Sequence, residues 1–404
     1  MGGGHRHVAP PADPAVRGRR ALAATVVLLI LSTSIGLVLL RPTGAEEIDV
    51  PGAGERVRGT VTTAVTAPCA DGSPDASDGA TRELCVELTV RIDEGPDAGQ
   101  TVQQEGGDNA TGRLGPGDGV VLAADPAAAT AQDRYQLTDS QRGRSLTALA
   151  VLFAVAVVAL GRLRGLLALL GLALSSAVLV GWLVPALLAG RPPVLTATVG
   201  ASAVMLSVLL LAHGPSVRTA TAIVGTAASL LLTLGLAVAF VEVSSLTGLT
   251  TEEATYVQAV FGGLDVRGLL LAGIVIGAVG ILDDVTVTQV SAVYELREAD
   301  PAMPVGDLYR AGLRVGRDHV ASLVNTLLLA YAGASLPLLV IFTTSDQGLV
   351  GTLTNGVVAE EIVRTLVGSI GLVSAVPITT ALAALACPRA GEAGMRRPSD
   401  AAGA

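Results

Sequence analysis

The stretch that decides the fold is GLLLAGIVIGAVGILDD, residues 268–284. Residues 268–282 carry no charge and would rise about 22 Å as a helix, which is less than the ~30 Å hydrocarbon core of a bilayer. The run ends in two adjacent carboxylates, Asp283 and Asp284, and residues 285–294 (VTVTQVSAVY) are again uncharged. A carboxylate at membrane depth is costly, so the pair needs a partner such as an arginine, a proton or a bound cation.

Two placements of this aspartate pair follow from the pattern. If the helix continues through residues 285–294, both carboxylates lie inside the membrane, in its cytosolic third. If the helix stops after Asp284, they form a helix C-terminus at the interface, where the negative end of the helix dipole disfavours them. Either placement requires a counter-charge.

The composition of the whole chain is that of a polytopic membrane protein. Half of the 404 residues are apolar, and only 15% are charged. All 26 basic residues are arginine, and aromatic residues make up 2% of the chain. A basic surface interleaved with aromatic residues is therefore missing from the sequence, and we expect no nucleic-acid partner.

Hydropathy predicts an all-α membrane bundle of about eight transmembrane helices. A disordered cytosolic tail, residues 1–20, precedes an anchor helix whose apolar run is too long for a cleaved signal peptide. Residues 145–388 form a seven-helix domain with a cytosolic connector at 285–318, and residues 389–404 form a second disordered cytosolic tail. The predicted spans are 21–40, 145–161, 165–189, 194–212, 218–243, 266–284, 319–344 and 364–386. Arginines gather in the loops and tails of one side, so we expect both termini in the cytosol.

Residues 41–143, between the first two spans, form a β-rich domain that we expect on the extracytoplasmic side. Apolar and polar residues alternate along Leu84–Ile92, which is typical of a half-buried strand. Arg56–Val65 is a second candidate strand, and the glycines of residues 115–119 indicate a turn. Several short strands in about a hundred residues predict a small barrel of the OB or SH3-like kind.

The cysteines and histidines offer few ligands for chemistry. Cys69 and Cys85 flank a loop rich in Gly, Asp and Ser, so they are a candidate disulfide, with two free thiols as the alternative. We expect Cys387 to be an inert thiol and His213, beside Gly214-Pro215, to be a loop residue. Such sparse His and Cys residues do not make a protein-built zinc site, and the sequence assigns no other metal.

A second polar group lies at the start of the next apolar run. Arg314 and Arg317 are one turn apart just before this run, Asp318 and His319 open it, and Asn325 lies about two turns deeper. Together with the aspartate pair they predict a hydrated cavity that binds a cation or relays protons. The structural alternative is an interfacial salt-bridge cluster, with Asn325 making only a helix–helix hydrogen bond.

The run before the aspartates also carries a stripe of small residues. Gly273, Gly277 and Gly280 recur at spacings of four and three residues. Glycines at such spacings let the backbone of another helix approach closely, so we expect helix packing along this face.

Signatures of enzymes are missing from the sequence. A lone Asp-Asp pair is not the motif of an intramembrane aspartyl protease, which needs acids on two helices in their own sequence contexts. The sequence contains no HExxH motif, Walker loop or Ser-His pairing. We therefore expect neither catalysis nor a cofactor.

Two blocks of the sequence resemble the YibE/YibF family of bacterial multi-pass membrane proteins. They are GAVGILDDVTVTQVSAVYELREADP, residues 277–301, and RAGLRVGRDHVASLVNTLLLAYAGASLPLL, residues 310–339. The similarity extends over about residues 50–385, and the chain looks like a fused form of two parts that are separate proteins elsewhere in the family. The resemblance implies a bacterial plasma-membrane protein of the permease or transporter class, and it brings no residue roles with it.

Two functional hypotheses follow from the sequence. The first is a permease of the plasma membrane, surrounded by lipid, with an intramembrane acidic, His and Asn site for protons or a small cation or solute. The second is a non-transporting scaffold, in which the outer domain binds an envelope protein or the chain forms a homo-oligomer. Activity that survives loss of the carboxylates but not of residues 50–140 would indicate the scaffold.

Overall fold

The computed structural model describes residues 14–43, 55–68, 84–107, 114–343 and 348–387. The chain divides into two compact units, one of residues 47–160 and the other of residues 1–46 together with 161–404. The division lies next to Arg162, whose φ of 52° and ψ of −126° interrupt the helix α4 (Gly143–Val178). A positive φ at a residue with a side chain breaks the regular helix.

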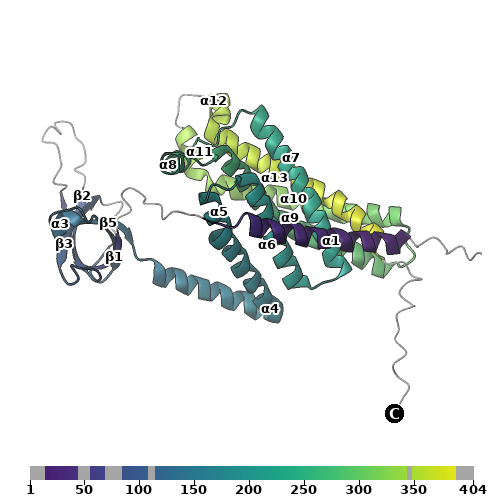
Figure 1. The fold of residues 1–404 in the computed structure, drawn as a ribbon, viewed down its shortest axis with the longest axis horizontal. Coiled ribbons are helices and arrows are strands. Elements are labelled where there is room, and N and C mark those ends of the chain that lie inside the picture. Colours follow the sequence, from purple (N-terminus) through teal and green to yellow (C-terminus); the bar gives the residue numbers. More distant parts are fainter. Residues whose placement is uncertain (1–13, 44–54, 69–83, 108–113, 344–347, 388–404) are drawn as a thin grey trace, which may run out of the picture. The chain divides into compact units, whose positions relative to one another are not determined.

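The smaller unit contains a five-stranded sheet in the order β3-β2-β1-β4-β5, in which each neighbouring pair is antiparallel. The alternation predicted for Leu84–Ile92 is confirmed, because Leu88, Val90 and Ile92 are at most 1% exposed and lie in the core of the sheet. Figure 1 shows the sheet curled into a ring. Its strands are β1 (Glu55–Pro68), β2 (Leu84–Ile92), β3 (Thr101–Gly107), β4 (Gly119–Ala124) and β5 (Tyr135–Ser140), with the short helix α3 (Ala131–Arg134) before β5.

Glutamine side chains join the two edges of this curled sheet. Gln104 on β3 donates to the carbonyl oxygen of Tyr135 over 2.7 Å and accepts from the amide of Leu137 over 2.9 Å. Around the curled sheet the order is therefore β1-β2-β3-β5-β4. The predicted disulfide joins Cys69 and Cys85, and Cys69 lies outside the described residues.

Within the described residues, six helical segments are long and apolar enough to cross a membrane. The segment Gly143–Leu188 joins α4 to a π-helical turn, η1 (Leu179–Leu183), and to α5 (Val184–Leu188), and it contains both spans predicted at 145–161 and 165–189. The other five are Gly18–Leu39 in α1 (Pro14–Leu39), α6 (Pro193–His213), α7 (Val217–Val243), α9 (Val266–Ala299) and α13 (Gly356–Ala386).

The remaining helices are shorter or less apolar. The predicted span 319–344 is divided between α10 (Val305–Ala334) and α11 (Leu336–Thr343), and α10 is not among the six apolar segments. The charged first half of α10 explains this difference, because Arg310, Arg314 and Arg317 belong to the same helix as the apolar residues that follow. The two short helices are α8 (Glu252–Val260) and α12 (Gly348–Thr354).

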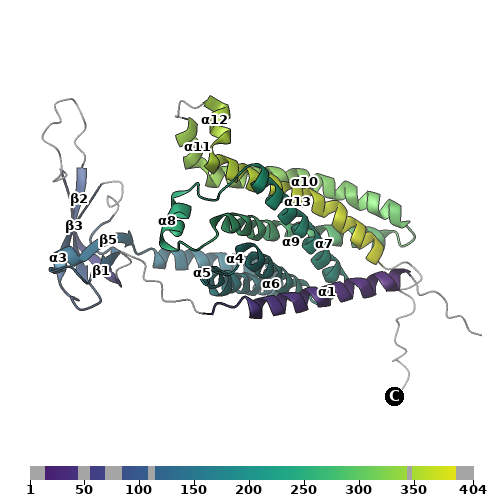
Figure 2. The same cartoon turned by 45° about the horizontal axis from the view of Figure 1, so that its top comes forward.

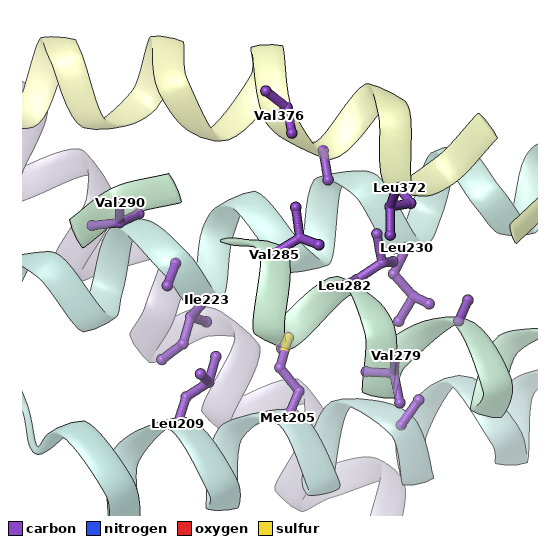
Figure 3. Packing of buried hydrophobic residues seen from close by; sticks show 14 of the residues in the cluster. Met205, Leu209, Ile223, Leu230, Val279, Leu282, Val285, Val290, Leu372 and Val376 are labelled. Atoms are coloured by element: carbon purple, nitrogen blue, oxygen red, sulfur yellow. The ribbon is translucent and has the colours of Figure 1, made fainter. Parts of the chain in front are cut away.

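Helix α9 lies at the centre of the larger unit. It packs against α6, α7, α10 and α13, and Figure 2 shows it among them. Figure 3 shows Leu282 and Val285 of α9 in one core with Leu372 and Val376 of α13. This central position gives the aspartates of α9 several neighbouring helices.

The structure extends α9 beyond the end predicted at residue 284, through the first part of the predicted connector. Residues on the packed face remain buried at Val285, Gln289 and Val293, and the pattern continues to Arg297. Spacings of about four residues keep these side chains on one face of a helix. Packing against other helices therefore continues past the two charges, and only residues 300–304 separate α9 from α10.

Candidate functional site

Asp283 lies near the middle of α9, on the wall of a cavity of about 480 Å³. Since α9 is 34 residues long, its length is about 51 Å, and Asp283 is about 26 Å from its start. The helix is thus continuous through both aspartates and does not stop after Asp284; that the pair lies at membrane depth stays a prediction. Apolar residues make most of the wall: Leu179, Val204, Val208, Leu209, Ile276, Val279 and Val287.

One oxygen of the Asp283 carboxyl group lacks a hydrogen-bond donor. Its Oδ1 atom is buried and has no hydrogen-bond partner among the described residues. The hydroxyl of Thr226 on α7 lies beside the carboxyl, but it is also 2.6 Å from the hydroxyl of Thr286. Thr286 donates to the main-chain oxygen of Asp283 over 3.2 Å.

Asp284 and His213 line the same cavity but are more exposed than Asp283. Both side chains are exposed, and His213 is the last residue of α6. The sequence predicts His213 in a loop, because Gly214-Pro215 follows it, whereas His213 belongs to the last turn of α6. The Gly-Pro pattern contains no signal for the cavity. Within the described part of the chain, no group of three or more His, Cys, Asp or Glu side chains is arranged to hold a metal ion.

The structure does not bring the predicted partners on α10 to the two aspartates. Arg314, Arg317, Asp318, His319 and Asn325 are all exposed on α10, and none lines the Asp283 cavity. Among the described residues the aspartate pair forms no ion pair. The cavity is instead built by α4, η1, α6 and α9.

Gln289 is the polar residue that actually joins α9 to α10. It is 4% exposed, and its Nε2 donates to the carbonyl oxygen of Gly312 over 2.8 Å and to Oγ1 of Thr380 on α13 over 2.7 Å. Its position in the block LDDVTVTQ was visible in the sequence, but an isolated glutamine did not reveal which helices it joins.

Close approach between helices occurs at glycines outside the predicted stripe. A Cβ atom at Gly273 or Gly280 would meet no described atom within 4 Å, and at Gly277 it would meet only the hydroxyl of Tyr331, at 3.6 Å. At Gly316, by contrast, it would collide with Val376 and Gln289. Gly280 lines the Asp283 cavity instead, so the absence of side chains there leaves space for the cavity.

Cys387 lies at the C-terminal end of α13 and is 3% exposed. Burial raises the pKa of its thiol, and the guanidinium of Arg297 opposes this effect only in part. A thiol with a raised pKa remains protonated at neutral pH and is a poor nucleophile. This environment agrees with the expectation of an inert thiol.

The fold and the cavity together define a class, a polytopic membrane protein with an acidic cavity inside its helical bundle. The family model described as YibE/F-like protein matches residues 149–389, more than half of the 404 residues. The chain therefore belongs to the YibE/F-like family, as its sequence blocks implied. The matched range begins after the β-rich domain. Neither a curated protein nor a solved structure matches the chain.

Proposed function

We propose that this protein is a permease that binds a proton or a small cation at Asp283. The observation that carries the proposal is the buried Oδ1 atom of Asp283, which has no hydrogen-bond partner among the described residues and faces a largely apolar cavity. Burying an unpaired carboxylate is costly. A bound proton or cation would remove that cost, which gives the group a reason to bind one.

The surroundings of Asp283 support a site that loads and releases its ion. Asp284 and His213 add exposed titratable groups on the wall of the same cavity, where they can pass protons or attract cations. The π-helical turn η1 contributes Leu179, and such turns are frequent at functional sites in helices. Ionisable groups between helices commonly mark ion pathways in transporters.

The proposal extends to the location of the protein. Arginines gather in the loops and tails of one side, which favours a plasma membrane with both termini in the cytosol. The β-rich domain then faces the outside, and bacterial origin follows from the family resemblance. Its expected partners are lipid and a small ion or solute.

Thermal unfolding of the full chain in detergent tests the proposal. The midpoint is measured over a range of pH and with a panel of monovalent and divalent cations, for the wild type, Asp283→Asn and Asp318→Asn. A ligand at a hundred times its dissociation constant stabilises the folded state by about 2.7 kcal/mol. Asp318 is the matched control, because it is a carboxylate in the same bundle but outside the cavity.

We expect a pH- or cation-dependent rise of the midpoint in the wild type and in Asp318→Asn. Asp283→Asn should lose this response, because an amide binds neither a proton at neutral pH nor a cation as a carboxylate does. If all three proteins respond alike, Asp283 is structural and the proposal is wrong.

A further inference from the structure

A second cavity, of about 450 Å³, lies at the end of the bundle where α6 ends and α7 begins. Its polar lining comes from four elements and the turn between two of them: Arg164, His213, Ser216, Arg218, Thr219 and Ser291. It shares Leu209, His213 and Val287 with the Asp283 cavity. The two cavities are therefore neighbours with a common wall.

The charge of this second cavity is positive. Arg164 and Arg218 line it, and none of its lining residues is acidic. Arg164 is exposed and forms no ion pair with a described residue, so its charge is not neutralised there. Arg218 is held in place and its charge is balanced, because it pairs with Glu298 and Glu295 on α9. Its guanidinium carbon lies 4.7 Å from the centre of the Tyr294 ring. The positive charge of the cavity therefore comes from Arg164.

The start of α7 adds hydrogen-bond donors to the same space. Ser216 caps the helix by accepting from the amide of Thr219 over 3.1 Å. The amide of Arg218, in the first turn, has no acceptor within the helix. Such amides carry partial positive charge and favour an anion.

We propose that this basic cavity binds an anionic phosphate or carboxylate group. Arg164 supplies the unpaired charge, Arg218 a fixed guanidinium edge, and the first turn of α7 an amide and the Ser216 hydroxyl. Charge-assisted hydrogen bonds of this kind are the usual means by which arginine recognises phosphate and carboxylate. The inference does not depend on a proton or cation at Asp283.

The same anionic group can come from a soluble ion or from a lipid headgroup, and basic sites between membrane helices bind both. Two arms of one experiment separate these sources. In the first, purified full-length protein is titrated with inorganic phosphate at constant ionic strength, and the unfolding midpoint is measured. In the second, nanodiscs of phosphatidylcholine with or without phosphatidylglycerol are used, and bound lipid is counted by native mass spectrometry.

Each variant is paired with a matched control, so that a loss of anion binding can be distinguished from a loss of folding. Arg164→Gln removes the unpaired charge, and Arg310→Gln is the matched control, since Arg310 is an exposed arginine whose only ion pair with a described residue is to its helix neighbour Asp307. Ser291→Asp adds a repelling carboxylate to the exposed lining, and Ser291→Asn is its neutral counterpart.

We expect affinity for the anion to fall about tenfold or more in Arg164→Gln, the effect of losing one charge-assisted hydrogen bond. Ser291→Asp should weaken binding as well and more than Ser291→Asn does, whereas Arg310→Gln should bind as the wild type does. A response only in the phosphate arm supports a soluble anion, and a response only in the lipid arm supports a headgroup. No response in either arm, or equal responses in all variants, would overturn the proposal.

Discussion

Gln289 illustrates at the scale of one residue how the bundle is joined. Its side-chain amide is buried and donates to α10 and to α13 at the same time. Hydrogen bonds between membrane helices average about 0.6 kcal/mol each, with larger values for well-placed ones. A single side chain thus fixes three helices relative to one another.

Replacing Gln289 by Leu removes both hydrogen bonds while keeping a similar volume. We expect Gln289→Leu to lower the free energy of unfolding by about 1–2 kcal/mol. Denaturant unfolding of the purified protein in detergent measures the change. Thr288→Ala is the control, because Thr288 is exposed and, among the described residues, its hydroxyl donates only to the main-chain oxygen of Asp284 in the same helix. Equal stability of Gln289→Leu and the wild type would show that the two hydrogen bonds of Gln289 contribute nothing to the free energy of unfolding.

At the scale of elements, α9 shows what the sequence could and could not predict. The alternation of Leu84–Ile92 and the apolar run before Asp283 were sufficient to place a strand and a helix. The end of α9 was not predictable, because the burial of Val285, Gln289 and Val293 depends on helices distant in sequence. The same dependence explains why spacing alone did not indicate the close helix contact at Gly316.

A glycine at a close helix contact and a glycine beside open space should respond differently to an added methyl group. Gly316→Ala should destabilise the protein by about 1–3 kcal/mol, because its Cβ would collide with Val376 and Gln289. Gly273→Ala should be neutral or stabilising by up to about 1 kcal/mol, because its Cβ meets no described atom and alanine favours helices. Unfolding midpoints of the two variants provide the comparison. A reversed order of stability would mean that α9 and α10 pack differently from the structure.

At the scale of the whole molecule, the chain consists of a barrel unit and a helical unit. The family match, residues 149–389, lies almost entirely in the helical unit. Each unit has its own hydrophobic core. This division predicts that the helical unit carries the ion site without help from the barrel.

Removing residues 50–140 therefore tests the two hypotheses against each other. We expect the shortened protein to fold and to retain the Asp283-dependent change of midpoint with pH or cations, because all lining residues of that cavity remain. The midpoint of the wild type under the same conditions is the reference. Loss of the response in a shortened protein whose helical content is unchanged would contradict this prediction, because the ion site would then depend on the outer domain.

The central claim is that Asp283 holds a proton or cation inside an apolar cavity, and labelling by a hydrophobic carbodiimide tests it most directly. Carbodiimides react with protonated carboxyl groups, and peptide mass spectrometry locates the modified residue. We predict that Asp283 is labelled faster than the exposed Asp318, and that a bound cation slows labelling of Asp283 alone. Equal labelling of both aspartates, unaffected by pH and by every cation tested, would contradict the account.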